Sequence, residues 1–314
     1  LSSRKKGLMN LDLFETTVEK LAARGMRSTV LHTIGDPLAN KNIAKYLEIL
    51  RQHKFTISSF STNALMLDRH MDTVFEYRDV IYNFRPSIDA ASKEVYERIR
   101  FGGKWETLHR NLINFSERNN ALKNPFPVVV NNIVAKENFH EIAMIPHVFS
   151  YLAPPTDFRY AFLNSLSPQN EYFLSQNYFE KEYVRNAPCS IIWNSVYVLK
   201  NGDLTTCCRD YNGDLVFGNI DEDSLEDAYN NEKLKSIRRA HIDEDVKNMP
   251  ALCQTCFMVD PRLSDLLNQI FQYFFLHVKK HPAYLQSQLD EIGGALKKRD
   301  FEGLINKLES MRSV

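Results

Sequence analysis

The sequence lacks an excess of charge, because 39 lysines and arginines balance 39 aspartates and glutamates among 314 residues. A formal net charge of zero leaves no electrostatic footprint for nucleic acid, so no nucleic-acid partner is expected. Long apolar runs are also lacking: the best stretch, IFQYFFLHV, has about half the length that a bilayer requires. No membrane partner is therefore expected. The first residues, LSSRKKGLMN, contain no apolar stretch of the kind found in signal peptides, which favours a cytoplasmic protein.

Cysteine is scarce and unevenly placed. All five cysteines lie between Cys189 and Cys256. Disulfides are one interpretation, but nothing else in the sequence indicates secretion. Cysteines confined to one segment favour a metal site in a reducing compartment.

The spacing within that segment supports a metal site. Cys189 is followed by twelve residues, Gly202, four residues and Cys207, and Cys253 and Cys256 form a C-x-x-C pair. A C-x-x-C turn places two thiolates at one corner of a metal site. The other two thiolates flank Asn201-Gly202, a strong hairpin signal. Four such soft ligands suit either a zinc ion or an iron–sulfur cluster. Cys208, beside Cys207 on the expected strand, is expected to point to the opposite face as a small buried apolar residue.

The pattern continues with GNI, an amphipathic helix ending in IRRAH, and the C-x-x-C pair. It closely resembles the SPASM domain, and its shortened form the twitch domain, of radical S-adenosylmethionine (SAM) enzymes. A full SPASM domain carries seven cysteines and two clusters, whereas no cysteine follows Cys256. The one-cluster twitch pattern of aminocyclitol dehydrogenases is the closer match. The resemblance implies one auxiliary [4Fe–4S] cluster held by Cys189, Cys207, Cys253 and Cys256.

Residues 1 to about 165 alternate between helix and strand patterns. Helices are expected over residues 11–24, 40–53, 67–77, 91–119 (with a break at Phe101-Gly102-Gly103) and 137–151. Strands are expected over residues 28–31, 55–62, 79–89, 125–134 and 157–163. This alternation predicts a parallel sheet covered by helices, with ligands at the carboxyl ends of the strands. Five strands are too few for an eightfold barrel, which leaves a partial barrel or a doubly wound sheet.

Three short polar stretches follow consecutive strands: Gly35-Asp36-Pro37, Ser61-Thr62-Asn63 and Ser87-Ile88-Asp89. Each alone is an ordinary turn or helix cap. Together they resemble the SAM-binding loops of the radical SAM core, which implies that SAM contacts Gly35, Asp36, Pro37, Thr62, Asn63, Ser87 and Asp89. A glycine turn with a carboxylate can receive the cationic amino group of SAM. The stretch YERIRFGG (residues 96–103) strengthens the resemblance, although Asp36 and Ala64 replace the glutamate and glycine of the family pattern.

The C-x-x-x-C-x-x-C motif of radical SAM enzymes does not occur in this sequence. The resemblance implies that those three thiolates hold the [4Fe–4S] cluster that reduces SAM, so its ligands are not among these residues. Arg4, Gly7 and Met9 match the R-x-x-G-x-M pattern that follows the motif in the family. We therefore expect the natural protein to carry the motif and the first strand before Leu1; a cluster-free descendant is the alternative.

The expected fold is α/β, with three parts. A partial (β/α)6-type barrel lacking its first strand covers residues 1–180, a hairpin-plus-helix SPASM/twitch domain covers 185–262, and a helical extension covers 263–314. Helices are expected over 263–278 and 285–311, with Pro282 as an interruption and a turn around Gly293-Gly294. An apolar stripe in the extension predicts packing against the barrel or a homodimer contact: Leu285, Leu289, Ile292 and Leu296.

The resemblance implies a radical SAM oxidoreductase. SAM would be cleaved to a 5′-deoxyadenosyl radical that oxidises an alcohol, as on a sugar or aminocyclitol, and the auxiliary cluster would accept an electron. An external donor such as flavodoxin or ferredoxin would supply the first electron. An enzyme that modifies a peptide or protein is one alternative, and a non-catalytic binding protein with a structural metal is another. No catalytic residue is assigned, and a substrate pocket is expected among polar strand residues: Arg85, Asn131, Asn132, Arg159 and Asn164.

Overall fold

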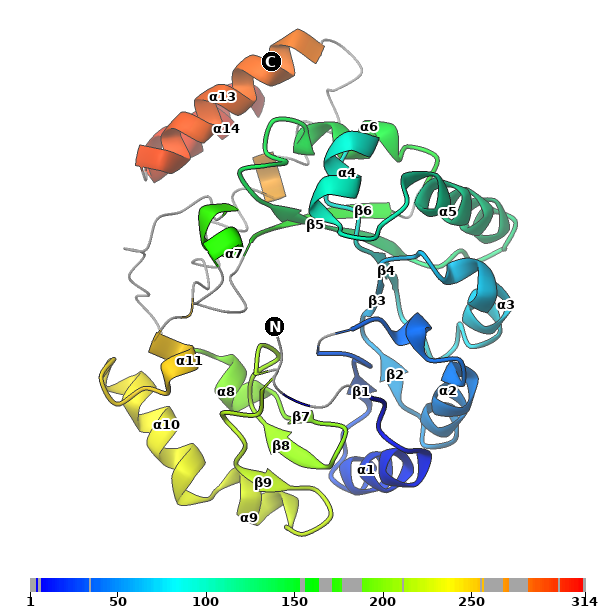
Figure 1. The fold of residues 1–314 in the computed structure, drawn as a ribbon, viewed down its shortest axis with the longest axis vertical. Helices are drawn as coiled ribbons and strands as arrows, with labels where there is room; N and C mark the ends of the chain where they lie inside the picture. Colours follow the sequence, from blue (N-terminus) through cyan, green and yellow to red (C-terminus); the bar gives the residue numbers. More distant parts are fainter. Residues whose placement is uncertain are drawn as a thin grey trace. The chain divides into compact units, whose positions relative to one another are not determined.

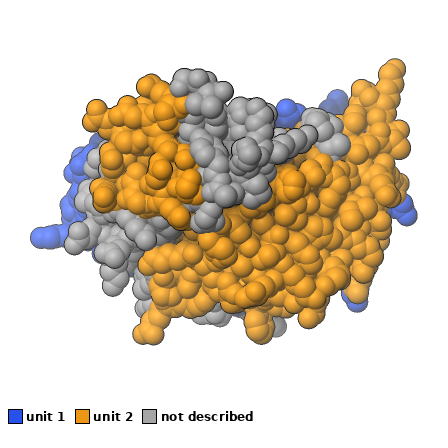
Figure 2. Space-filling view, turned by 90° about the horizontal axis from the view of Figure 1, so that it is seen from above, with its two compact units in different colours: residues 1–60, 72–82, 185–256 blue, residues 61–71, 83–184, 257–314 orange. Residues whose placement is uncertain are grey.

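The computed structural model describes residues 4, 7–33, 35–152, 156–163, 171–176, 188–210, 212–254, 256, 268–270, 282–298 and 300–312. The fold is mixed α/β and divides into two compact units (Figure 2). Unit 1 comprises residues 1–60, 72–82 and 185–256, and unit 2 comprises 61–71, 83–184 and 257–314. The sequence division into 1–180, 185–262 and 263–314 stays a prediction. In the described chain, no helix has both the length and the apolar character needed to cross a bilayer.

Unit 1 begins with alternating helices and strands: α1 (Leu11–Ala23), β1 (Ser28–Thr29), the 3-10 helix η1 (Pro37–Ala39), α2 (Ile43–Gln52) and β2 (Thr56–Ile57). α1 begins where the Asn10 side chain accepts a hydrogen bond from the Leu13 N–H at 2.7 Å. β1 and β2 pair in parallel, and α2 is the crossover between them. Its buried residues include Ile43, Leu47 and Leu50, which recur at helical spacing along one face.

The second part of unit 1 is a small sheet with short helices: α8 (Ile191–Asn194), β7 (Tyr197–Val198), β8 (Asp203–Thr205), β9 (Gly218–Asn219), α9 (Leu225–Tyr229), α10 (Glu232–Ile242) and α11 (Ala251–Gln254). β7, β8 and β9 form an antiparallel sheet in that order, which confirms the hairpin. Gly202 supplies its turn at φ +89°, where a Cβ atom would lie 2.8 Å from the Asn219 side chain.

α1 joins the two parts of unit 1. Leu13 of α1 packs against the core of the small sheet, which includes Leu204, Phe217 and Leu234. The Lys20 ammonium also donates to the Ile220 carbonyl at 2.5 Å. Figure 1 shows α1 beside β9. These contacts connect the cysteine segment to the first helix of the chain.

Unit 2 contains a four-stranded sheet in the order β3-β4-β5-β6, made of β3 (Phe60–Thr62), β4 (Phe84–Pro86), β5 (Val128–Val134) and β6 (Thr156–Phe162). Its helices are the end of α3 (Leu67–Glu76) nearest β3, α4 (Lys93–Ile99), α5 (Trp105–Asn120), η2 (Ile142–Met144), α6 (Ile145–Val148), α7 (Glu171–Gln176), α13 (Pro282–Lys298) and α14 (Phe301–Arg312). β5 lies parallel to both β4 and β6, as the strand–helix alternation predicts.

The two faces of this sheet differ. Burial alternates along β5, so that Val128, Val130 and Val134 are buried while Asn131 and Ile133 are half-buried. α4, α5 and α6 lie on one side of β4–β6 (Figure 1), and Phe115 of α5 stacks on Phe84 of β4 with ring centroids 4.2 Å apart. The opposite face carries the more exposed, more polar residues. At the β6 edge, the Asn268 side chain accepts from the Tyr160 N–H at 2.7 Å and donates to its carbonyl at 3.1 Å.

Two predicted strands are wrong in extent. The strand expected over 55–62 is two strands, because β2 pairs with β1 while β3 joins the larger sheet. Ser58 and Ser59 lie at the break, where serine side chains compete with ladder hydrogen bonds. The strand expected over 79–89 shortens to β4, with isolated bridges at Ile81 and Ser87.

The helix expected over 137–151 is reduced to η2 and α6. Pro146 lacks a backbone N–H and is tolerated only in the first turn of a helix, so α6 begins at Ile145. Before it, the Asn138 side chain binds the Ala135 N–H and the Ile133 carbonyl and holds a non-helical turn.

The C-terminal helices also differ from expectation. Pro282 is the first residue of α13, which matches the preference of proline for helix starts. Gly293 and Gly294 lie within α13, and the turn comes before α14, where the Asp300 side chain accepts from the Gly303 N–H at 2.8 Å. Most of the helix expected over 263–278 lies outside the described residues. Within that range the structure describes residues 268–270, and they are helical.

Candidate cluster site and cofactor loops

The five cysteines of unit 1 are free thiols. Cys189 is buried just before α8 and packs against Ile192 and Ile237. Cys253 lies in α11, and its carbonyl accepts a hydrogen bond from the Cys256 N–H at 3.1 Å. The C-x-x-C pair therefore forms the tight turn that its spacing predicts.

Cys207 and Cys208 follow β8 and contact each other. The Cys207 thiol donates to the Cys208 sulfur, which raises the pKa of Cys207 and lowers the pKa of Cys208 to about 6. Tyr197 of β7 also donates to Cys208, and burial is the main cause that raises the pKa of Tyr197 to about 12. The expectation that Cys208 points away from Cys207 is wrong, because β8 ends at Thr205 and strand alternation does not extend to these residues.

Arg209 connects this loop to the C-x-x-C turn. Its Nη1 atom donates to the Cys256 sulfur at 2.9 Å, and the residue is only 7% exposed. The negative charge that Cys256 can carry also acts on Cys207. The loop after β8 and the C-x-x-C turn thus meet around a buried guanidinium.

The donor set fits an iron–sulfur cluster. A zinc ion with Zn–S bonds of about 2.3 Å would bring its sulfurs within about 4 Å of one another. Within the described chain, no three cysteine sulfurs lie within 4.8 Å of one another. A four-iron cluster needs a wider set because each thiolate binds a separate iron. The thiolates and the buried cation suit such an anionic group, and five cysteines supply ligands for one cluster of this kind, not two.

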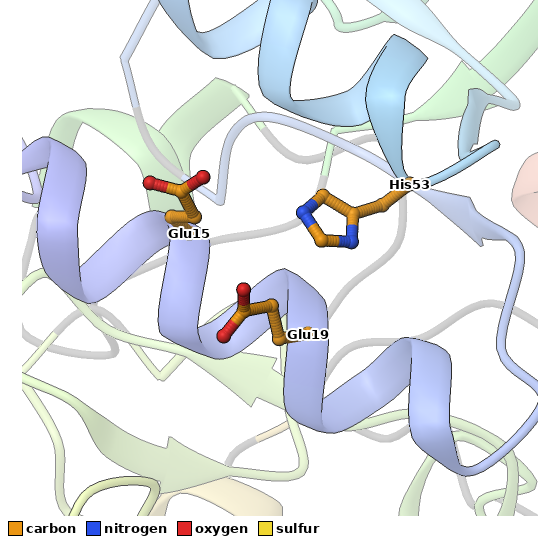
Figure 3. Close-up of side chains that lie close together, drawn as sticks. All are labelled: Glu15, Glu19 and His53. Atoms are coloured by element: carbon orange, nitrogen blue, oxygen red, sulfur yellow. The ribbon is translucent and has the colours of Figure 1, made fainter.

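One other group of potential metal ligands occurs in the described part of the chain. Figure 3 shows Glu15 and Glu19 on α1 facing His53 at the end of α2, with ligand atoms within 4.8 Å of one another. Glu19 is exposed and the other two are half-buried. Oxygen and imidazole donors do not suit an iron–sulfur cluster, so this surface group is separate from the cysteine site.

The first SAM loop predicted from the sequence is a turn in unit 1. Gly35 has φ +114°, a conformation that favours glycine, and a Cβ atom there would meet nothing within 4 Å. The Asp36 side chain caps η1 by accepting from the Leu38 N–H at 2.9 Å, and Pro37 begins that helix. The turn thus presents backbone and a carboxylate at an open position.

The second loop lies in unit 2. The Thr62 hydroxyl accepts from the Ala64 N–H at 3.0 Å, and the Asn63 side chain accepts from the Leu65 N–H at 2.9 Å. Ala64 has φ +60°, which explains why the family pattern has glycine at this position. The buried Asn111 of α5 holds the loop by donating to the Ala64 carbonyl at 2.8 Å.

The third loop differs between its two polar residues. The Asp89 side chain is buried, accepting from the Ile133 N–H at 2.7 Å and pairing with Arg100 at 2.5 Å. Asp89 also has φ +69°, and its carbonyl accepts from the Asn138 side chain at 2.7 Å. Both oxygens of its carboxylate therefore have protein partners. Ser87 is half-buried, and among the described residues its hydroxyl has no hydrogen-bond partner.

The predicted substrate residues separate by face. Ser87, Asn131 and Arg159 lie in register on neighbouring strands, on the more exposed face of the sheet. Arg85 lies on the same face, and burial, with the charge of Arg159, lowers its pKa. Asn132 is buried on the opposite face, donating to the Arg159 carbonyl at 3.3 Å, so it lines the helix-covered side instead. Asn164 lies outside the described residues.

Sequence reasoning missed Arg209, Asn111 and Asn138. A basic residue directly after two cysteines is a local signal that could have indicated Arg209. The two asparagines act through contacts 46 to 49 residues away, and no local pattern marks such contacts.

Comparisons with known proteins identify two domains in the chain. Residues 2–145 match the family described as the radical SAM superfamily, and residues 189–257 match SPASM, an iron–sulfur cluster-binding domain. A GTP 3',8-cyclase from Synechocystis sp. is 28% identical over 122 residues, which are 38% of this chain and 34% of that protein. The chain therefore spans about a third of the length of this curated relative.

Two solved structures share the fold. One is BtrN in complex with AdoMet (SAM) and 2-DOIA, with a TM-score of 0.53 and 17% sequence identity. The matched region covers 82% of this chain and 83% of the BtrN chain. The other is anSMEcpe with bound AdoMet and the Cp18Cys peptide, with a TM-score of 0.59 and 12% sequence identity. The matched region covers 93% of this chain and 92% of the anSMEcpe chain.

The cofactors follow from the two domains. A radical SAM domain uses SAM and a [4Fe–4S] cluster, and a SPASM domain binds auxiliary iron–sulfur clusters. Residues 2–145 thus match a radical SAM domain, and residues 189–257, which follow them, match a SPASM domain.

Proposed function

We propose that this radical SAM enzyme oxidises an alcohol of a small molecule such as a sugar or aminocyclitol, with one auxiliary cluster as electron acceptor. The observation that carries the proposal is the cysteine site. Cys189, Cys207, Cys253 and Cys256 would hold one cluster, and the buried guanidinium of Arg209 lies 2.9 Å from the Cys256 sulfur. Positive charge at a cluster ligand favours a cluster that gains an electron.

The bound groups would supply the radical chemistry: SAM and its cluster would be the source of the 5′-deoxyadenosyl radical, and the auxiliary cluster would be the acceptor of one electron. Oxidation of an alcohol carbon to a carbonyl removes a hydrogen atom, a proton and an electron. The protein must therefore bind SAM, hold the substrate and accept the proton. An external donor such as flavodoxin or ferredoxin would supply the electron that begins each turnover.

We assign SAM binding to the three predicted loops. Gly35 and Asp36 would receive the amino group, because an open glycine turn with a carboxylate suits a cation. Thr62, Asn63 and Ser87 would supply polar contacts, and Pro37 and Asp89 would hold the loop backbone. The polar sheet face with Arg85, Asn131 and Arg159 would contact substrate hydroxyls.

A peptide-modifying enzyme is the second candidate. The similarity to peptide-bound anSMEcpe covers more of this chain than the similarity to BtrN does, and that observation favours it. Both candidates use the same cofactors, so the products distinguish them: a ketone on a small molecule, or a mass change on a peptide. A homodimer formed through α13 and α14 stays a prediction, which sedimentation would check.

The proposal is tested with Cys253→Ala in a protein that also carries the C-x-x-x-C-x-x-C motif of radical SAM enzymes. We expect the auxiliary iron to be lost and product formation to collapse, while cleavage of SAM to 5′-deoxyadenosine continues. Cys208→Ala is the matched control and should keep its iron and its product. If Cys253→Ala forms product and 5′-deoxyadenosine in the wild-type ratio, the auxiliary cluster is structural and the dehydrogenase proposal fails.

A further inference from the structure

Arg209 stands out among the charged residues of unit 1 because it is buried against a cysteine. It is 7% exposed, in the turn that follows β8, and its Nη1 atom lies 2.9 Å from the Cys256 sulfur. The preceding residues are Cys207 and Cys208, so one guanidinium is close to the loop after β8 and to the C-x-x-C turn. Its charge also acts on the Cys208 sulfur.

The neighbouring carboxylate is committed elsewhere. Asp210 is 2% exposed, and it accepts hydrogen bonds from the Thr205 hydroxyl at 2.6 Å and from the backbone N–H groups of Gly213, Asp214 and Leu215 at 2.7 to 3.1 Å. These bonds fix the loop that carries Arg209.

Burial of a guanidinium is costly unless an anion lies beside it, and arginine does not lose its proton in proteins. Four cysteine thiolates give an iron–sulfur cluster a net negative charge, which increases when the cluster takes up an electron. A buried cation that donates to a ligand sulfur therefore stabilises the reduced cluster more than the oxidised one. Hydrogen bonds to the sulfurs and net charge are two of the properties that set the potential of such clusters.

We propose that Arg209 sets the reduction potential of the auxiliary cluster, raising it so that the cluster accepts an electron from the substrate more readily. This inference rests on the proposed auxiliary cluster and adds a role for a residue that is not itself a ligand. Arg209 acts as a positioning and charge-compensating residue through Cys256.

The test uses the 314-residue chain, whose five cysteines all lie between Cys189 and Cys256, reconstituted anaerobically with iron and sulfide. Arg209→Gln removes the charge but keeps an N–H donor, and Arg209→Lys keeps the charge without the planar guanidinium. Arg239→Gln is the matched control, because it removes the same charge from an exposed position on α10. Iron and sulfide content is measured first, and the midpoint potential is then measured by a redox titration followed by electron paramagnetic resonance.

We expect Arg209→Gln to retain its cluster and to shift the midpoint potential to a more negative value. Arg209→Lys should shift it less, and Arg239→Gln should leave it unchanged. Equal potentials in the two glutamine variants would overturn the inference while leaving the auxiliary cluster in place. Loss of the cluster from both Arg209 variants would also overturn it, since Arg209 would then hold the two loops together. A wild-type chain that binds no iron and sulfide would instead refute the proposed function.

Discussion

The cysteine site of unit 1 and the Asp89 turn of unit 2 came from the same family resemblance, but they differ in how their charges are balanced. At the cysteine site a buried cation, Arg209, faces sulfurs that become anionic only when they lose their protons. At the turn a buried anion, Asp89, already has its cation, Arg100, at 2.5 Å. The first site is completed by a bound group, whereas the second is complete within the protein.

This difference separates residues that bind a cofactor from residues that hold a loop. A carboxylate with two protein partners has little capacity left for a ligand, and removing its cation or its charge is costly. A half-buried hydroxyl without a partner, such as that of Ser87, keeps its capacity. We therefore expect Asp89 to position the loop and Ser87 to contact SAM.

The largest effect is expected for Asp89→Asn. Asparagine tolerates the positive φ of this residue and can still accept from the Ile133 N–H, so the change mainly removes the partner of Arg100. Breaking a buried ion pair should lower the free energy of unfolding by about 3 kcal/mol, measured by urea denaturation. Asp157→Asn breaks the more exposed pair with Arg159 and should cost below about 1 kcal/mol. Equal losses would contradict the assignment of Asp89 to the fold.

The next effect concerns Ser87→Ala. Loss of one hydrogen bond to bound SAM should raise the KM for SAM by about tenfold, with the melting temperature unchanged. Ser116→Ala is the contrasting variant, because the Ser116 hydroxyl already donates to the Tyr151 carbonyl at 2.5 Å. It should lower the melting temperature and leave the KM for SAM unaltered. A Ser87 variant that is unstable but normal in KM would reverse the comparison.

A smaller effect is expected for Ala64→Gly in the loop that precedes α3. Ala64 is fully buried at φ +60°, a conformation that costs an alanine about 1 kcal/mol and a glycine almost nothing. Because glycine also loses more entropy on folding, we expect a net gain below about 1 kcal/mol in the free energy of unfolding. Ala143→Gly in η2 is the control and should lose about 1 kcal/mol. A loss at both positions would show that Ala64 is not strained.

The sequence predicted the parts of the molecule that depend on local or regularly spaced signals. The helices α1 and α2, the Asn201-Gly202 hairpin and the C-x-x-C turn are confirmed, because each depends on residues close together in the chain. The three strand-end loops were found because each lies directly after a strand pattern.

Contacts between distant residues could not be predicted in this way. The two partners of the Asp89 carboxylate, Arg100 and Ile133, come from different elements, and only the folded sheet brings Ile133 beside it. The orientation of Cys208 was predicted wrongly because the prediction assumed that the strand, with its alternating side chains, continues past Thr205, where β8 ends. The split of residues 55–62 between two sheets depends on pairing partners that a strand pattern does not specify.

The smallest effect is expected for a titrating residue of unit 2, His109, which lies in neither of the two regions compared above. His109 of α5 lies against Phe149, with ring centroids 4.6 Å apart, and its Nδ1 atom is 3.0 Å from the Tyr151 hydroxyl. Burial lowers the pKa of His109, and the charge of Glu106 opposes this in part.

The folded state disfavours the imidazolium form of His109. The contribution of His109 to stability is therefore present above the unfolded pKa of about 6.5 and is lost as pH falls through the folded pKa. His109→Phe keeps an aromatic ring there but cannot titrate, so the free energy of unfolding of the wild type should fall relative to that of the variant as pH falls from 8 to 5. Urea denaturation across that range measures the difference, in which the other titrating groups cancel. A difference that stays constant with pH would show that His109 titrates alike in the folded and unfolded chain.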